Sequence, residues 1–445
     1  MQSANTKDNN LERGLSLPQA TAINMIDMVG IGPFVTIPFI VSVLQGPICI
    51  VAWILGALLA YTDGMVWAEL GAKWPEAGGS YAFLQKLFGK WGSLMAFLFI
   101  WQTVIQAPLV VASGAIGFSQ YLTFLIPLNT WQQKAVSGTL VILLVVLLYR
   151  NIKSIGRISI VFGILTLGTL IWLIVSGIPH FKAAQAFDWH TTAFNSNIAL
   201  FAAIGMASVK SVYSYLGYYN VCHLGAEIKD PAKNIPRSIF ISITGIAILY
   251  LSMQVVILGV LPWEEVANSK FIASTYFEHL YNHTAGQVAT LLILCIAIAS
   301  LFSVILGYSR IPYAAARNGD FFPIFARIHP KHKIPHISLL VLGALGFIFS
   351  LLFRLGDVIT AIVVVRILIQ FVSQSVGLIA WHKNHRKEGM PFKMPLFPIP
   401  AIISILIWMF IFGSNKWQYM LGAVGIILSG LILFFLWGRF KKPAN

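Results

Sequence analysis

The hydrophobic positions of this chain gather in long runs instead of alternating with polar positions. Twelve such runs are separated by short polar connectors. A helix needs about 20 mainly apolar residues to cross the hydrocarbon core of a bilayer, so each run predicts a membrane-spanning helix. The predicted spans are 18–43, 47–71, 91–120, 133–149, 156–178, 196–227, 237–261, 286–314, 336–353, 356–381, 397–412 and 417–438.

The polar segments between these runs are short. The longest of them, around 178–195, 262–285 and 315–335, each have about twenty residues, which leaves no room for a separate soluble domain. The first seventeen residues are polar, and the run that follows is longer than the apolar region of a signal peptide. The chain also contains no P-loop, HExxH or GxSxG motif, so we do not expect an enzyme.

Composition supports a membrane protein. Of the residues, 58% are hydrophobic and 10% are charged, and the mean hydropathy is +0.79, which excludes a water-soluble globule. The three cysteines, Cys49, Cys222 and Cys295, lie in apolar runs without metal-ligand spacing. We interpret them as packing residues and expect no resident metal or cofactor.

The net charge of +15 is unevenly distributed. With twelve spans, 23 of the 30 Lys and Arg residues fall on the side of the termini, five fall on the other side, and Lys210 and Arg366 lie within spans. Cytoplasmic loops carry the excess of Lys and Arg, so both termini are predicted to be cytoplasmic. The basic residues then orient the chain and contact anionic lipid, and no nucleic-acid partner is expected.

Two predicted spans carry helix breakers near their middle. The first contains Gly30, Gly32 and Pro33, and the sixth contains the sequence 214–220, Ser-Tyr-Leu-Gly-Tyr-Tyr-Asn. Unpaired backbone is tolerated at membrane depth only where it lines a cavity or is buried in protein. Interrupted spans at corresponding positions of two halves indicate a transporter binding site, and these two breaks are five spans apart.

Four sequence strings carry a resemblance to a known family. They are GIGPF at 30–34, ELG at 69–71 with PEAGGSY at 75–81, GAEIKDPAKNIPR at 225–237, and SR at 309–310 with AARNGD at 315–320. In this order and at these places, the chain resembles the amino acid–polyamine–organocation (APC) superfamily.

The resemblance implies an all-α membrane protein of twelve transmembrane helices. It implies a LeuT-type arrangement, with a first five-helix repeat at 18–178, an inverted second repeat at 196–381 and two additional helices at 397–438. Residues 1–17 and 439–445 are then cytoplasmic tails. Members of the superfamily carry amino acids or polyamines.

The first break suits a carboxylate. Amides at the positive end of a half-helix attract anions, and the glycines allow close approach of the backbone. Pro33 has no amide hydrogen, so the predicted cradle consists of Gly30, Ile31, Gly32 and Phe34. In the second break, the resemblance implies that the carbonyls of Tyr213, Ser214 and Leu216 bind an ammonium group. It also implies that the Tyr213 ring closes over the substrate and that Tyr218 and Asn220 shape the side-chain pocket.

Ionisable residues inside spans are costly and indicate function. Asp27 precedes the first break, Lys210 precedes the second, and Arg366 lies near the middle of span ten. Asp27 is expected either to pair with Arg366 or Lys210 or to couple transport to protons. Arg366 is expected to contact Asp27 or the carbonyls of the broken turn, as a structural ion pair or as a coupling charge.

The coupling ion is left open between H+ and Na+. Some relatives place a lysine in span five, and by alignment that position is Thr166 here. Its hydroxyl would suit a sodium site, together with Ser300 and Ser303 of span eight; alternatively, Lys210 supplies the missing charge. Gln102 and Gln106 share a face of span three and either line the pocket or bind neighbouring helices.

These features together predict a secondary amino acid permease of the cell membrane that works by alternating access. The alternative within the superfamily is a polyamine or other organocation carrier. Polycations require acidic pocket residues, whereas this chain has Lys210 and Arg366 within its spans. The expected partners are a small amino acid and the lipid bilayer, and no obligate protein partner is evident from the sequence.

Overall fold

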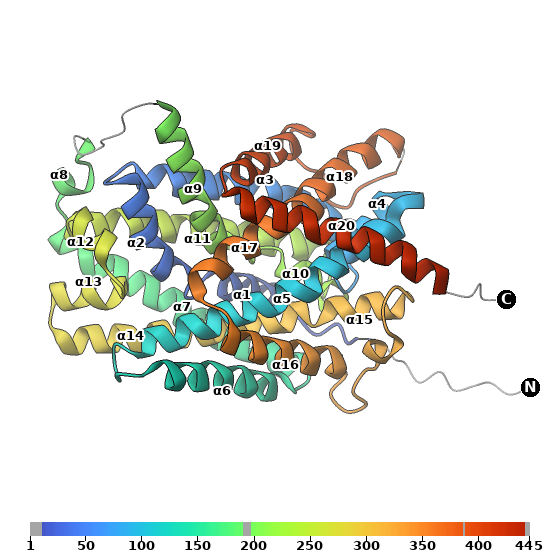
Figure 1. Cartoon of the computed structure of the whole chain (residues 1–445), viewed down its shortest axis with the longest axis horizontal. Coiled ribbons are helices and arrows are strands. Elements are labelled where there is room, and N and C mark those ends of the chain that lie inside the picture. Colours follow the sequence, from blue (N-terminus) through green and yellow to red (C-terminus); the bar gives the residue numbers. More distant parts are fainter. Residues whose placement is uncertain (1–10, 190–196, 386–387, 441–445) are drawn as a thin grey trace, which may run out of the picture.

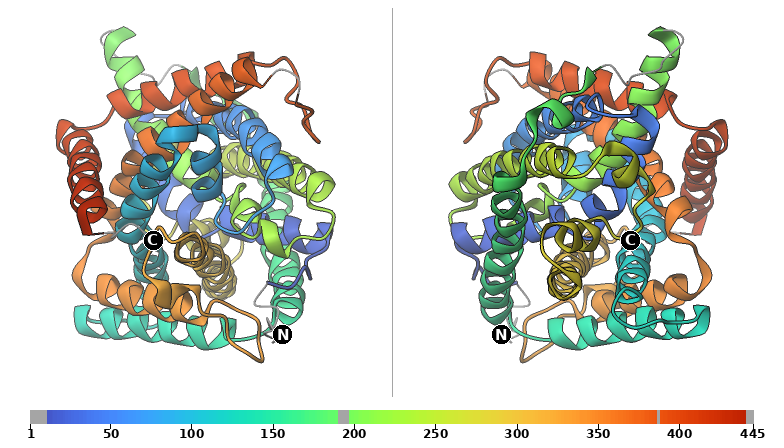
Figure 2. Two further views of the ribbon diagram at one scale, coloured as in Figure 1. Left: turned by 90° about the vertical axis from the view of Figure 1, so that its right-hand side faces the viewer. Right: turned by 90° about the vertical axis from the view of Figure 1, so that its left-hand side faces the viewer.

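The computed structural model describes residues 11–189, 197–385 and 388–440, and these residues form helices and no strand. The long helices run roughly side by side as a bundle, and both ends of the described chain lie at the same end of it (Figure 1). The end views in Figure 2 show α20, in red, on the outside of the bundle. Most of the predicted tails, at 1–10 and 441–445, lies outside the described residues.

The longer helices are continuous apolar rods. They are α3 (Cys49–Lys73), α5 (Gly92–Leu122), α6 (Thr130–Leu148), α7 (Ile152–Gly177), α9 (Asn197–Tyr215), α11 (Pro231–Val260), α14 (His283–Tyr308), α16 (His336–Leu352), α19 (Ile399–Gly413) and α20 (Trp417–Phe440).

The remaining helices are shorter or lie next to breaks. They are α1 (Leu17–Met28), α2 (Gly32–Leu44), α4 (Ser80–Leu87), η1 (Gly89–Trp91), η2 (Ile178–His180), α8 (Ala183–Ala186), α10 (Asn220–His223), η4 (Gly225–Glu227), α12 (Trp263–Asn268), α13 (Ile272–Leu280), α15 (Arg310–Arg317), η5 (Pro323–Ala326), α17 (Leu355–Arg366), the π-helical segment η6 (Ile367–Val372) and α18 (Ser373–Asn384).

Among the described residues, nine helices are long and apolar enough to cross a membrane, or ten if the bent pair α1–α2 counts as one span. The predicted segments 336–353 and 397–412 correspond to α16 and α19, which are apolar helices of only 17 and 15 residues. The helical class and the position of each predicted segment agree with the structure, and segment ends differ by several residues. Residue 196, the predicted start of span six, lies outside the described residues.

Both predicted breaks are present. Helices α1 and α2 meet at an angle of 43° across residues 29–31. In the sixth predicted span, α9 stops at Tyr215 and α10 starts at Asn220, so four residues between them are not helical. A further irregularity that the sequence did not signal lies in the tenth predicted span, where the π-helical segment η6 follows Arg366. Such segments often occur at functional sites.

Candidate functional site

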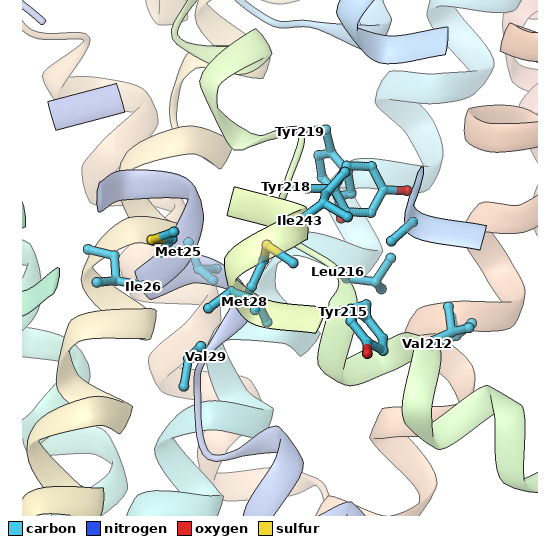
Figure 3. Close-up of a cluster of buried hydrophobic side chains, with 14 of the residues drawn as sticks. Met25, Ile26, Met28, Val29, Val212, Tyr215, Leu216, Tyr218, Tyr219 and Ile243 are labelled. Carbon is cyan, nitrogen blue, oxygen red and sulfur yellow. The ribbon is translucent and has the colours of Figure 1, made fainter. Parts of the chain in front are cut away.

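The two helix breaks pack directly against each other at the centre of the bundle. Gly217, in the break between α9 and α10, has a φ of +124°, and a Cβ added there would lie 2.7 Å from the backbone nitrogen of Met28 at the end of α1. Glycine is the residue that tolerates both this conformation and this close approach. Figure 3 shows Met28 and Val29 on one break and Tyr215 and Leu216 on the other.

Tyr250 of α11 holds the two breaks together. Its buried hydroxyl lies 2.8 Å from the carbonyl oxygen of Met28 and 3.2 Å from that of Ser214. Both carbonyls belong to helix ends that lack the next helical turn, so the hydroxyl satisfies backbone that would otherwise be unpaired. No sequence motif marks Tyr250, which lies in an ordinary apolar run.

We predict that Tyr250→Phe costs about 1–2 kcal/mol of stability, because carbonyls of both breaks lose their shared donor. Tyr276→Phe is the matched control, since Tyr276 is also buried but donates to a single carbonyl, that of Leu173, away from the breaks. Thermal melts in detergent measure the effect. A loss of stability in Tyr250→Phe no larger than that in Tyr276→Phe would contradict a role for Tyr250 at the breaks.

A small cavity of about 60 Å³ lies between the breaks. Six helices and the two breaks supply its wall. Its polar and ionisable lining consists of Asp27, Ser113, Tyr213, Ser214, Tyr219, Ser300, Tyr308 and Arg366, and its other lining residues are Met28, Gly30, Ile31, Gly32, Val110, Gly114, Leu216, Gly217, Ala297, Leu301, Val304 and Ile362.

The start of α2 presents free backbone amides at this cavity. The N–H groups of Gly30, Ile31 and Gly32, which line the cavity, donate no hydrogen bond within the described residues, and neither does that of Phe34, which lies outside the cavity wall. Unpaired amides at a helix N-terminus favour an anion. The space in front of them is narrow, because a Cβ on Gly32 would lie 3.1 Å from the Tyr213 ring and 3.6 Å from the Ser214 hydroxyl.

On the other side of the cavity, the second break presents backbone carbonyls. The carbonyl of Ser214 accepts from Tyr250, and that of Tyr213 accepts from the amide of Leu216. The Leu216 carbonyl accepts no hydrogen bond within the described residues. The cavity therefore has amide donors on one wall and carbonyl acceptors on the other.

Arg366 brings a permanent positive charge to the cavity, and its side chain is almost fully buried. Its Nε donates to Gln370 at 2.8 Å and its Nη2 donates to the Tyr219 hydroxyl. The guanidinium carbon lies 5.1 Å from the centre of the Tyr219 ring and 5.8 Å from that of Tyr308. Aromatic faces attract a cation without neutralising it.

Asp27 lines the same cavity but forms no ion pair within the described residues. Arg366 bonds to Tyr219 and Gln370, and Lys210 donates to the Thr360 hydroxyl at 3.0 Å. The expected direct pairing of Asp27 with either cation is therefore not formed. The hydrogen bonds of the guanidinium go to Tyr219 and Gln370 instead, and the rings of Tyr219 and Tyr308 lie against it.

A wider vestibule of about 650 Å³ lies next to the cavity. On four helices the residue one turn away from the cavity lines the vestibule: Thr36 on α2, Ile116 on α5, Lys210 on α9 and Ile359 on α17. The vestibule also borders the α5–α6 and α16–α17 connections, which Figure 1 places away from the chain termini.

An apolar layer separates the cavity from the vestibule. It consists of Ala112, Ile116, Leu355 and Ile359, with Val35, Tyr213 and Phe349 packed against them. The Tyr213 hydroxyl lies 3.1 Å from the Ser113 hydroxyl, so this ring bridges α9 and α5. Tyr213 thus stands at the vestibule side of the cavity.

The end of the bundle near the termini is closed by buried polar contacts. Arg310 of α15 binds Glu227 with two hydrogen bonds of 2.8 and 2.9 Å, and both side chains are buried. The amides of Gly14 and Leu15 each donate to the Glu227 carbonyl at 3.0 Å. The N-terminal segment therefore lies across the end of the second broken span.

Of the predicted site residues, nine line the cavity: Gly30, Ile31, Gly32, Tyr213, Ser214, Leu216, Asp27, Ser300 and Arg366. The Ser300 hydroxyl lies 3.4 Å from the carbonyl of Asp27, directly over the first break. The structure therefore brings residues of the two predicted breaks together at one cavity. Asp27 from the first half of the chain and Arg366 from the second half line the same cavity.

Three other predicted residues instead connect helices. Tyr218 donates to the buried carboxylate of Asp63, which also accepts from Trp67, Ser404 and Trp408. Asn220 donates to Ser303 at 2.9 Å, and the Ser303 hydroxyl in turn donates to the carbonyl of Ile23.

The remaining four predicted residues also lie outside the cavity wall. The Phe34 carbonyl accepts from Tyr121, and Lys210 lines the vestibule with its ammonium 5.1 Å from the Phe39 ring. The side-chain amide of Gln102 and the hydroxyl of Thr166 are buried without a hydrogen-bond partner among the described residues.

Sequence reasoning missed Tyr219, Tyr308 and Ser113 as cavity residues. Tyr219 lies within the second break, so its position in the sequence could have indicated that it lines the cavity. Tyr308 and Ser113 lie in long regular helices, and their proximity to the breaks comes only from packing.

Comparison with known proteins identifies the family to which this chain belongs. A family model described as amino acid permease matches residues 15–438. The branched-chain amino acid permease BcaP of Bacillus subtilis is 25% identical over 462 residues, which covers all of this chain and 97% of the relative. The serine/threonine exchanger SteT of the same organism is 25% identical, covering 99% of this chain and all of the relative.

A mammalian relative is similarly distant. The b(0,+)-type amino acid transporter 1 of Mus musculus is 24% identical over 457 residues, which covers 99% of this chain and 91% of the relative. These matches extend over nearly the whole chain and agree with its many apolar helices, which indicate a multi-pass membrane protein. The chain belongs to the amino acid permease family of the APC superfamily.

Proposed function

We propose that this protein is a secondary active transporter that carries amino acids across the cell membrane by alternating access. The observation that carries the proposal is the meeting of two broken spans at one cavity, with free amides on one wall and carbonyls on the other. An amino acid has a carboxylate and an ammonium group, and this arrangement complements both. Amino acid transporters among the relatives support the same substrate class.

The LeuT-type arrangement of twelve spans is part of this proposal. In it, residues 18–178 and 196–381 form two inverted repeats of five spans, and 397–438 supplies two additional spans. Its support is the position of the breaks, in the first span of each half. Alternating access is supported by the difference between the two ends of the bundle: a vestibule at one and a buried Arg310–Glu227 pair at the other.

The test is uptake of radiolabelled amino acids into proteoliposomes, with imposed sodium or proton gradients in separate arms. Accumulation above that of protein-free liposomes supports the proposal. The response to each gradient identifies the coupling ion, for which Asp27, Lys210, Arg366, Thr166, Ser300 and Ser303 are the proposed coupling residues. Uptake of spermidine but of no amino acid would favour the polyamine alternative, which the buried Arg366 opposes.

We further propose that both termini are cytoplasmic. A cysteine at exposed Asn268 in α12 is then expected to react with an impermeant maleimide on intact cells, whereas one at exposed Asn384 reacts only after the membrane is opened. The wild-type chain controls for its native cysteines, two of which are buried. The reverse labelling pattern would invert the proposed orientation.

A further inference from the structure

The guanidinium of Arg366 keeps unused hydrogen-bonding capacity inside the cavity. It has five N–H donors, of which one on Nε binds Gln370 and one on Nη2 binds the Tyr219 hydroxyl. Nη1 makes no hydrogen bond within the described residues, although the side chain is only 1% exposed. A buried guanidinium cannot lose its proton, so a free donor edge at a binding cavity calls for an anionic partner.

The neighbours of Arg366 position this charge without neutralising it. Tyr219, Tyr308 and Phe371 have ring centres 5.1, 5.8 and 5.2 Å from the guanidinium carbon. The side chain is thereby held in one orientation at the cavity wall. A planar guanidinium held in this way matches the two oxygens of a carboxylate.

The cavity thus offers a substrate three polar binding features: the amides of α2, Asp27 with the carbonyls of the second break, and Arg366. The free amides at the start of α2 suit the α-carboxylate, and Asp27 together with the carbonyls of the second break suits the α-ammonium. An amino acid with a neutral side chain uses these two and leaves Nη1 of Arg366 without a hydrogen-bonded anion. An amino acid with a second carboxylate uses all three.

We propose that the transported substrate is an acidic amino acid, whose side-chain carboxylate binds Arg366. This inference rests on the proposed function and names the substrate class of the same site. The small volume of the cavity, about 60 Å³, favours a short side chain over a long one. Two other cations in the vestibule lining, Lys134 and Arg354, favour the arrival of an anion.

The decisive experiment uses the wild-type protein and compares substrates in pairs. The two members of each pair have nearly equal shape and differ in the charge of the side chain. Uptake of radiolabelled L-aspartate and L-glutamate into proteoliposomes is measured in competition with unlabelled L-aspartate, L-glutamate, L-asparagine and L-glutamine. We expect each acid to compete at least about 30-fold better than its amide, because a buried charge pair broken on one side costs about 2 kcal/mol or more. Only the carboxylate pairs with Arg366.

Variants test the assignment to this residue. Arg366→Gln is expected to remove the preference for L-aspartate over L-asparagine, whereas Arg366→Lys keeps the charge and retains a weaker preference. Arg157→Gln, at an exposed arginine of α7, is the matched control and is expected to keep the wild-type preference. Circular dichroism and thermal melts confirm that each variant is folded.

The two proposals fail in different ways. Equal competition by acids and amides, or uptake of neutral amino acids alone, would overturn the acidic substrate and leave amino acid transport intact. A full acidic preference in folded Arg366→Gln would overturn the role of Arg366. No uptake of any amino acid would contradict the proposed function itself. Because the wild-type comparison needs no variant, poor folding of Arg366→Gln does not prevent the test.

Discussion

Gly32→Val is expected to abolish uptake while the protein remains folded in the membrane. A Cβ at Gly32 lies 3.1 Å from the Tyr213 ring, and the two methyl groups of valine extend further into the narrow space before the amides of α2. A carboxylate excluded from two such amides loses charge-assisted hydrogen bonds worth about 3 kcal/mol or more in total, which corresponds to more than about 100-fold in affinity.

The matched control is Gly168→Val, at an exposed glycine of α7 where an added Cβ meets nothing within 4 Å. It introduces the same side chain into a membrane helix and is expected to transport at the wild-type rate. Reconstituted protein is quantified for each variant so that uptake is compared per molecule. Near-normal uptake by Gly32→Val would show that the amides of α2 do not bind the substrate.

Arg310→Ala is expected to produce the largest loss of stability. The substitution leaves the Glu227 carboxylate buried and unpaired, and breaking a buried pair on one side costs about 3–5 kcal/mol. Because the pair closes one end of the bundle, we also expect a cysteine introduced nearby, at buried Ser309, to become more reactive. Thermal melts and thiol labelling in detergent measure the two effects.

Two further variants make this prediction specific. The double variant Arg310→Met, Glu227→Leu replaces both charges with apolar groups and is expected to regain most of the stability. Lys73→Ala removes the partly exposed pair with Glu388 and is expected to cost at most about 1 kcal/mol. A loss in Arg310→Ala no larger than that in Lys73→Ala would show that the buried pair does not hold this end together.

The sequence predicted the residues of the two breaks well, because glycine and proline act on the backbone where they stand. Gly30, Gly32 and Gly217 are all at the cavity. The roles of polar side chains were predicted less well. Tyr218 and Asn220 stand within two residues of Tyr219, yet they bind Asp63 and Ser303 on other helices while Tyr219 faces the cavity.

For the charged residues within the spans, too, the sequence predicted their importance better than their contacts. The sequence marked Asp27, Lys210 and Arg366 as unusual, since each interrupts an apolar run. It did not show that Arg366 lies among aromatic rings and that Lys210 lines the vestibule and not the cavity. Those positions depend on which helix faces pack against each other. A helix that is apolar on every side does not indicate which of its faces packs against a neighbouring helix.

The sequence by itself determined that this chain is a helical membrane protein, where its apolar segments run and which two of them break, because these properties depend on hydrophobicity and backbone chemistry along the chain. Only the tertiary structure decided which side chains share the cavity, that Tyr250 joins the two breaks, and that Arg366 keeps a free donor edge toward the cavity. These contacts join residues far apart in sequence, and long-range packing between helices, not local propensity, sets them.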